Sequence, residues 1–199
     1  MEDPMIVVLF QAAVKSGLFS TVCRYNMRGA GNSKAKWTKA SLDPLFDPHM
    51  DDFIAVCQHL LSGGPSPPTT LFVAGYSYGA CVAASGIEYV PAVAGYVGIG
   101  FPLGGAANLA LRSRQHWAHL ADTQIPKLVV HGTRDKYGAL TTLREFAAQY
   151  HAAEPEPGPL DLAVIDGADH FFAGLWDEVA QKTLAWIGKR AEQLQAGGA

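Results

Sequence analysis

One serine of this 199-residue chain lies between two glycines at the end of an apolar run. The stretch LFVAGYSYGA, residues 71–80, stops abruptly at Gly-Tyr-Ser-Tyr-Gly. Glycines on either side of a serine permit a tight turn from a strand into a helix, and the apex of that turn pushes Ser77 out at the edge of a sheet. The pattern is common, and a serine that merely caps the following helix is the other interpretation. The motif alone leaves both open.

A serine hydroxyl is a poor nucleophile unless a base removes its proton and a carboxylate orients that base. Two later strands supply these groups in order. The run KLVVHGTRD ends in Asp135, and the run LDLAVIDGADHFF carries His170 just after its strand. We therefore predict that His170 accepts the proton of Ser77 and that Asp135 orients His170. The backbone N–H of Tyr78, at the start of a helix, is predicted to face the oxyanion.

Other residues compete for these roles. His131 also ends a strand, but it is predicted to be a packed residue. Asp169 is adjacent to His170 and cannot easily face its ring, so Asp166 and Asp169 are expected to cap or tether the loop. Ser85 lacks a glycine on each side and is not a candidate nucleophile.

The elements that must position these residues alternate between strand and helix. Apolar runs predict strands at 19–27, 69–76, 93–100, 127–131 and 160–165, and helices are expected at 4–16, 49–61, 78–88, 113–121, 140–150 and 176–195. For the first helix, MIVVLF as a strand is the competing interpretation. Residues 34–48 look irregular, and 101–108 is predicted to be a loop. Strands apolar on both faces indicate an α/β fold, a three-layer αβα sandwich around a mostly parallel sheet. We expect one domain over 1–199 with a disordered tail at 193–199.

Composition excludes several functional classes. Hydrophobic residues make up 49% and charged residues 17%, so the chain can bury a large core. A net charge of −3 without a basic cluster argues against nucleic-acid partners. The acidic N-terminus and the absence of a long apolar run argue against a signal peptide or a membrane partner, and predict a cytoplasmic protein. Histidines and cysteines lack metal-ligand spacing, so no metal is expected.

Four motifs together resemble the α/β-hydrolase superfamily: RYNMRGAGNS, GYSYGA, HGTRD and GADHFF. The resemblance covers residues 4–190 and is closest to the small, lidless, dienelactone-hydrolase-like serine hydrolases. It implies a cofactor-free enzyme in which Ser77, His170 and Asp135 form a catalytic triad. The loop around Arg28 is then mainly structural.

The resemblance also implies which residues surround the substrate. The N–H of Tyr78 would supply one half of an oxyanion hole. Tyr76, Phe101 and Phe171 would line the substrate pocket.

The family pattern has strands before its first helix, and this sequence begins at that helix. One such strand lies between those expected at 19–27 and 69–76, and the loop after it gives the second oxyanion donor. The resemblance therefore implies an N-terminally truncated fold without that strand or donor. Two alternatives remain open: MIVVLF acts as a replacement strand, or a partner chain fills the gap.

The segment 101–126 is too short for a large lid, which predicts an open site for a small-molecule or peptide substrate. The expected activity is hydrolysis of a small ester, thioester or amide through an acyl-enzyme. The alternative is a catalytically weak or inactive α/β-hydrolase-like module that binds a ligand or partner. The oligomeric state is left open.

Overall fold

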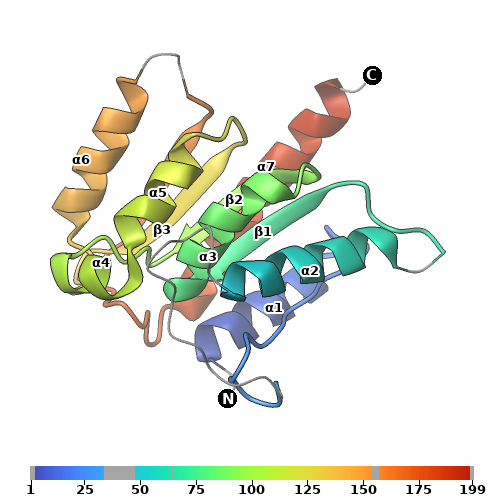
Figure 1. Cartoon of the computed structure of the whole chain (residues 1–199), viewed down its shortest axis with the longest axis horizontal. Coiled ribbons are helices and arrows are strands. Elements are labelled where there is room, and N and C mark those ends of the chain that lie inside the picture. The colour runs from blue at the N-terminus through green and yellow to red at the C-terminus, as the bar shows by residue number, and fades with distance from the viewer. Residues whose placement is uncertain (1–2, 34–47, 64, 154–156, 198–199) are drawn as a thin grey trace.

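The protein is a twisted parallel sheet covered by helices on both faces (Figure 1). The computed structural model describes residues 3–33, 48–63, 65–153 and 157–197. The strands are β1 (Leu71–Tyr76), β2 (Val93–Ile99), β3 (Lys127–Gly132) and β4 (Leu160–Ile165). They lie in the order β1-β2-β3-β4, and all neighbouring pairs are parallel. This arrangement brings the carboxyl ends of all four strands to one edge.

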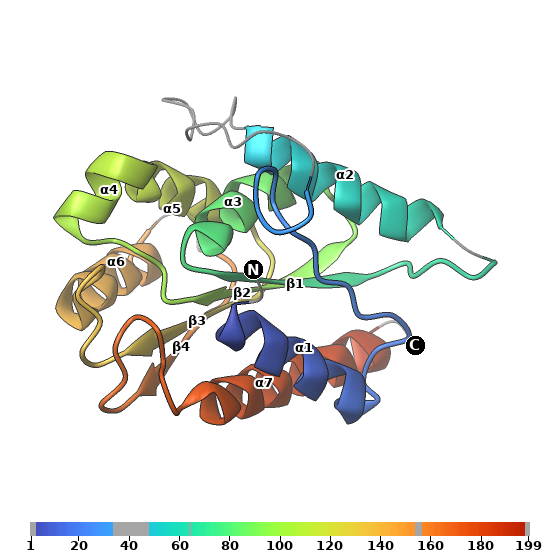
Figure 2. The same cartoon turned by 90° about the horizontal axis from the view of Figure 1, so that it is seen from below.

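The helices are α1 (Pro4–Ser16), α2 (Pro48–Ser62), α3 (Tyr78–Gly86), α4 (Gly105–Leu111), α5 (Ser113–Ala121), α6 (Leu140–His151) and α7 (Trp176–Gly197), with a 3₁₀ turn at Ile87–Tyr89. Figure 2 shows α1 and α7 on one side of the sheet and α2, α3, α4 and α5 on the other. The predicted three-layer αβα architecture is therefore confirmed.

The first helix forms because both of its ends are satisfied. The carboxylate of Asp3 accepts hydrogen bonds from the backbone N–H groups of Met5 and Ile6, and Gly17 ends the helix at φ 68°. Met5 and Leu9 are buried against the sheet and α7. The helix is thus confirmed over the competing strand for MIVVLF.

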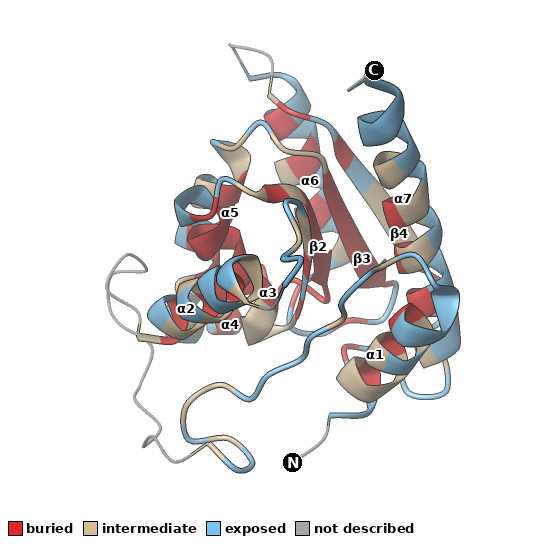
Figure 3. Cartoon of the chain, turned by 90° about the vertical axis from the view of Figure 1, so that its right-hand side faces the viewer, coloured by how far each residue is buried: buried red, intermediate tan, exposed pale blue. Residues whose placement is uncertain are grey.

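The sheet separates two apolar clusters. One side packs α2, α3, α5 and α6 over β1 and β2, and the other packs α1 and α7 over β2 and β3. Figure 3 shows the buried colour concentrated in the strands and in the helix faces turned toward them. Strands buried on both faces explain the continuous apolar runs of the sequence.

The strand expected at 19–27 is wrong. The segment carries no ladder hydrogen bonds, and most of its residues are exposed. Its β-branched and aromatic residues favour a strand, but a strand also requires a neighbour that accepts its backbone hydrogen bonds. β1 pairs with β2 on one side, and within the described residues nothing pairs with its other edge. The segment therefore contributes side-chain contacts, such as Phe19 against the apolar cluster of α1 and α7, without joining the sheet.

Two short segments differ from the sequence-based expectation, and a third lies mostly outside the described residues. The predicted loop at 101–108 contains the start of α4, which begins at Gly105. The tail predicted to be disordered from 193 forms the last turns of α7 as far as Gly197. The irregular segment expected at 34–48 lies almost wholly outside the described residues.

The edge of β1 that no described residue pairs with borders a cavity of about 650 Å³. The N–H groups of Leu71 and Ser77 donate to Ala92 and Ile99 on the β2 side. Successive residues of a parallel strand direct their backbone N–H and C=O groups to opposite neighbours. The N–H and C=O groups of Ala74 therefore point away from β2. Ala74 is exposed although it lies in the middle of the strand. Side chains of α1, of residues 18–25 and of α7 line the far side of the cavity.

Candidate active site

Three side chains form a continuous chain of hydrogen bonds at the carboxyl edge of the sheet. Ser77 Oγ lies 2.8 Å from His170 Nε2, and His170 Nδ1 lies 2.8 Å from Asp135 Oδ2. Ser77 directly follows β1, Asp135 lies in the loop after β3, and His170 lies in the loop after β4. The parallel sheet brings the three strand ends to one edge, but β1 and β4 are the outermost strands of the described sheet. The loop after β4 therefore reaches back across the edge to place His170 beside Ser77, 93 positions earlier in the chain, and beside Asp135, 35 positions earlier. The structure thus brings together the three residues that the sequence predicts as a set.

The turn at Ser77 has the geometry expected of a strained apex. Ser77 has φ 53° and ψ −120°, a conformation that costs a non-glycine residue about 1–3 kcal/mol. Its N–H donates to Ile99 O at 2.9 Å, which fixes the apex against β2. The Ser77 side chain makes no capping hydrogen bond to α3, so the helix-cap interpretation is wrong.

The two flanking glycines have different roles. A Cβ on Gly75 would lie 2.3 Å from the carbonyl oxygen of Gly79, so any side chain at position 75 would force β1 and α3 apart. A Cβ on Gly79 would meet only Met27 Cε at 3.6 Å, an ordinary contact. Only Gly75 is sterically required for the close passage of the two elements.

The Asp135 carboxylate is held by its own loop as well as by His170. Its Oδ1 accepts hydrogen bonds from the N–H groups of Tyr137 at 2.8 Å and Gly138 at 3.3 Å. Burial raises the pKa of Asp135, but the hydrogen bond and charge of His170 and the Tyr137 N–H outweigh it, and the pKa lies below its usual value. The group is therefore ionised at neutral pH and can stabilise a positive charge on His170.

The competing residues occupy supporting positions, as expected. His131 is buried, and its Nε2 lies 2.6 Å from Gly138 O. Asp166 accepts a hydrogen bond from the hydroxyl of Thr133, and Asp169 accepts one from the N–H of Phe171. These contacts tether the loops that carry Asp135 and His170.

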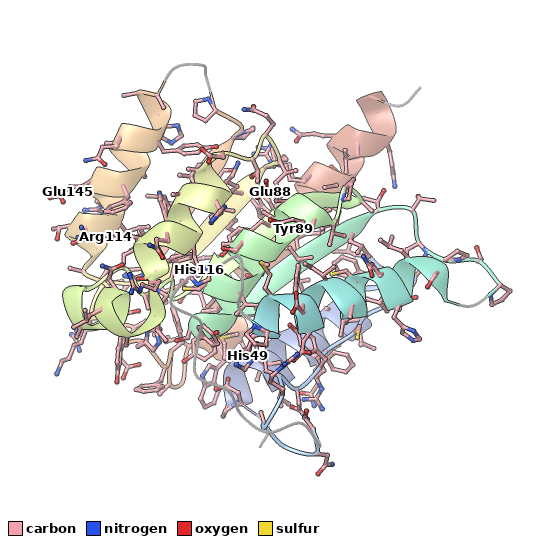
Figure 4. The ribbon with its side chains drawn as sticks, in the orientation of Figure 1. His49, Glu88, Tyr89, Arg114, His116 and Glu145 are labelled. Carbon is pink, nitrogen blue, oxygen red and sulfur yellow. The ribbon has the colours of Figure 1, made fainter. Side chains whose placement is uncertain are left out.

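A second serine–histidine pair lies in the core. Ser85 Oγ of α3 is 2.7 Å from Nδ1 of His116, which α5 contributes (Figure 4). Both residues are buried, with exposed fractions of 0% and 1%. A pair without access to solvent cannot contact a substrate. The hydrogen bond between Ser85 and His116 instead links α3 to α5.

The residues predicted to line the pocket separate into different environments. Phe101 is fully buried and packs edge-on against Trp117, so its predicted place in the pocket is wrong: it belongs to the core. Phe171 is 58% exposed and contacts the His170 ring. Tyr76 is half-buried, and its hydroxyl donates to His170 O at 3.1 Å.

No sequence motif indicated Tyr137, whose ring centroid lies 4.6 Å from that of His170. An available signal was its place two residues after Asp135, in the loop that must reach the histidine.

The loop around Arg28 is structural, as predicted. Arg28 Nε donates to Asp52 Oδ2 at 2.8 Å, and the guanidinium makes a second bond to the other carboxylate oxygen. This two-point ion pair fixes the loop to α2. Gly29 and Gly31 both have positive φ, which only glycine adopts without strain.

Across the described ranges, no helix is both long enough and apolar enough to span a membrane.

The chain matches a family model described as an alpha/beta hydrolase domain over residues 21–189. A search of curated proteins found no match. Among solved structures it is similar to a putative alpha/beta hydrolase from Agrobacterium tumefaciens, with a TM-score of 0.73 and 19% identity over 96% of this chain and 78% of that one.

Two further solved structures resemble the chain. A serine hydrolase without a lid from Xanthomonas campestris has a TM-score of 0.65 and 23% identity, over 91% of this chain and 71% of that one. An esterase from Pyrococcus furiosus has a TM-score of 0.69 and 18% identity, over 94% and 74%. At these identities the likeness concerns the fold, whereas the family model covers most of the sequence. The chain therefore belongs to the alpha/beta hydrolase family.

Proposed function

We propose that this protein is a serine hydrolase that cleaves a small ester, thioester or amide through an acyl-enzyme on Ser77. The observation that carries the proposal is the hydrogen-bond chain from Ser77 Oγ through His170 to the ionised carboxylate of Asp135. Membership of the alpha/beta hydrolase family supports it, and so does likeness to an esterase and to a lidless serine hydrolase.

Acylation begins with the proton of Ser77. His170 Nε2 accepts that proton while Ser77 Oγ attacks the carbonyl carbon of the substrate. Asp135 accepts a hydrogen bond from His170 Nδ1, which holds the imidazole in the tautomer with Nε2 unprotonated and stabilises the imidazolium that forms. The N–H of Tyr78, at the start of α3, donates to the oxyanion, where the helix dipole adds a favourable potential.

The intermediate collapses when His170 Nε2 returns the proton to the leaving alcohol, thiol or amine. Water then repeats the sequence on the acyl-enzyme, with His170 again acting as base, and releases the acid. No cofactor is needed for either half. The substrate is expected to be small, because the segment between β2 and β3 holds only two short helices.

A catalytically weak binding module is the second candidate. The unpaired edge of β1 favours it, because the resemblance places a neighbouring strand and the second oxyanion donor there. Loss of one such donor lowers kcat by about 10²–10³ where it has been tested. The two candidates differ in whether Ser77 reacts.

A fluorophosphonate probe with intact-mass detection distinguishes them. The parent protein should gain one probe adduct, and Ser77→Ala should gain none. Ser85→Ala is the matched control, because it removes the other serine hydroxyl that contacts a histidine and should leave labelling unchanged. Folded parent protein that takes up no probe would overturn the hydrolase proposal in favour of the binding module.

A further inference from the structure

Three aromatic rings contact the imidazole of His170, and two of them are open to solvent. Ring centroids lie 4.6 Å away for Tyr137, 5.7 Å for Tyr76 and 5.7 Å for Phe171. Tyr76 is partly buried, and its hydroxyl is used in the bond to His170 O. Tyr137 and Phe171 are 49% and 58% exposed. These two rings combine contact with the histidine and access for a ligand.

The two exposed rings also contact each other and stand on a fixed backbone. Their centroids lie 6.4 Å apart with the rings nearly perpendicular. The N–H of Tyr137 donates to Asp135, and its carbonyl oxygen accepts from Gly104 N at 2.7 Å. The N–H of Phe171 donates to Asp169, and its carbonyl oxygen accepts from the indole of Trp176. A ligand that packs against the pair meets a surface whose backbone is already ordered.

The proposed reaction places one part of the substrate beside these rings. The carbonyl oxygen must point toward the N–H of Tyr78, whereas the leaving atom must lie within hydrogen-bond reach of His170 Nε2, which protonates it. The group attached to the leaving atom therefore extends past the imidazole. The rings that touch the imidazole and remain exposed are those of Tyr137 and Phe171.

We propose that Tyr137 and Phe171 form the leaving-group subsite and select esters whose alcohol carries an aromatic ring. The inference rests on the proposed serine-hydrolase function and adds the substrate class to it. Edge-to-face and offset packing of aromatic rings favours such an alcohol over an aliphatic one. Each ring is expected to contribute about three- to tenfold in kcat/KM.

The test compares two acetate esters whose alcohols have similar acidity, benzyl acetate and 2-methoxyethyl acetate. The parent should prefer the benzyl ester in kcat/KM. Tyr137→Ser and Phe171→Ser should each lower that preference about three- to tenfold, mainly through KM, and Tyr137→Phe should retain it. Tyr89→Ser is the matched control: Tyr89 is 46% exposed, lies in the 3₁₀ turn after α3 (Figure 4), and should leave the preference unchanged.

A second substrate pair separates the leaving-group side from the acyl side. Ethyl acetate and ethyl phenylacetate share one alcohol and differ in the acid. The ratio of their kcat/KM values should therefore be the same in the parent, in Tyr137→Ser and in Phe171→Ser. Fluorophosphonate labelling of every variant reports whether the Ser77 site itself is intact. Normal labelling with an unchanged benzyl preference in Tyr137→Ser and Phe171→Ser overturns the subsite alone. Absence of labelling and of hydrolysis in the folded parent overturns the proposed function and the subsite with it.

Discussion

His131 Nε2 lies 2.6 Å from the carbonyl oxygen of Gly138, although neither residue belongs to the Ser77–His170–Asp135 chain. The N–H of Gly138 in turn donates to Asp135 Oδ1. Burial lowers the pKa of His131, so the ring is neutral at pH 7 and its Nε2 carries the proton donated to Gly138. The strand end of β3 is thereby tied to the loop that returns to the carboxylate.

This tether predicts a kinetic effect for His131→Phe, which keeps a ring but removes the donor. Gly138 O then loses a buried hydrogen bond, at a cost of about 1–3 kcal/mol in the free energy of unfolding. The Asp135 loop loosens, and kcat should fall about tenfold with little change in KM. Urea unfolding and steady-state kinetics measure the two effects. His151→Phe, at an exposed position at the end of α6, should change neither; an unchanged kcat in His131→Phe would contradict the tether.

Asp135→Asn should leave the fold nearly intact and lower kcat by about 10⁴. An amide can donate to His170 Nδ1 and stabilise the wrong tautomer, with Nε2 protonated and unable to accept the Ser77 proton.

The folded-state pKa of Asp135 is lowered, so the stability it contributes is present above its ordinary pKa and is lost as pH falls through the folded pKa. As pH falls below the ordinary aspartate pKa, the difference in unfolding free energy between parent and variant should therefore shrink, as urea unfolding at successive pH values measures. A constant difference would argue against this charge.

Gly75→Ala should abolish activity and strongly destabilise the protein. Its Cβ would lie 2.3 Å from Gly79 O, a backbone atom that can move only with the start of α3. Gly105→Ala is the control, since a Cβ there meets no atom within 4 Å in the described residues and alanine favours the helix. Thermal unfolding and probe labelling should separate the two variants. Equal stability would show that β1 and α3 have more room than the geometry allows.

The burial of Lys127 should make the free energy of unfolding increase between pH 8 and pH 10. Its Nζ is buried and donates to Thr123 O, Ile125 O and the hydroxyl of Tyr150. Burial lowers its pKa from 10.5 to about 8. Between these values the unfolded chain binds more protons than the native state, so this group makes the free energy of unfolding rise with pH, by up to about 1.4 kcal/mol per unit.

Lys127→Met removes this contribution. The stability difference between parent and variant should grow in favour of the parent from pH 8 to pH 10, as measured by urea unfolding. Cys57, whose pKa burial raises to about 11, titrates in the opposite sense in both proteins, so it cancels in the comparison. A difference that stays flat with pH would mean that Lys127 keeps its ordinary pKa.

The sequence was sufficient to predict the features that depend on local pattern. Continuous apolar runs that alternate with helical segments predicted four of the strands and the layered fold. The Gly-x-Ser-x-Gly turn and two strand-end polar residues predicted that Ser77, Asp135 and His170 meet in one place, and the hydrogen bonds between them show that they do. Each of these follows its own strand, and parallel strands bring such positions to one edge.

The errors concern properties that depend on neighbours. Residues 19–27 have strand composition, but the described sheet offers them no adjoining edge. Phe101 follows β2 at the correct edge, yet its side chain turns into the core against Trp117. Tyr137 was missed because its contact with His170 depends on how the Asp135 loop folds back.

One edge of β1 has no strand partner among the described residues, and this has a consequence for the behaviour of the protein in concentrated solution. A row of backbone donors and acceptors beside exposed Ala74 can template the addition of a strand from another molecule. Self-association by sheet extension is therefore expected to rise with protein concentration. A lysine at this position repels a second identical edge, so Ala74→Lys should raise the concentration at which light scattering detects oligomers. The strand that leads into the candidate nucleophile is therefore also expected to set the concentration at which the protein self-associates.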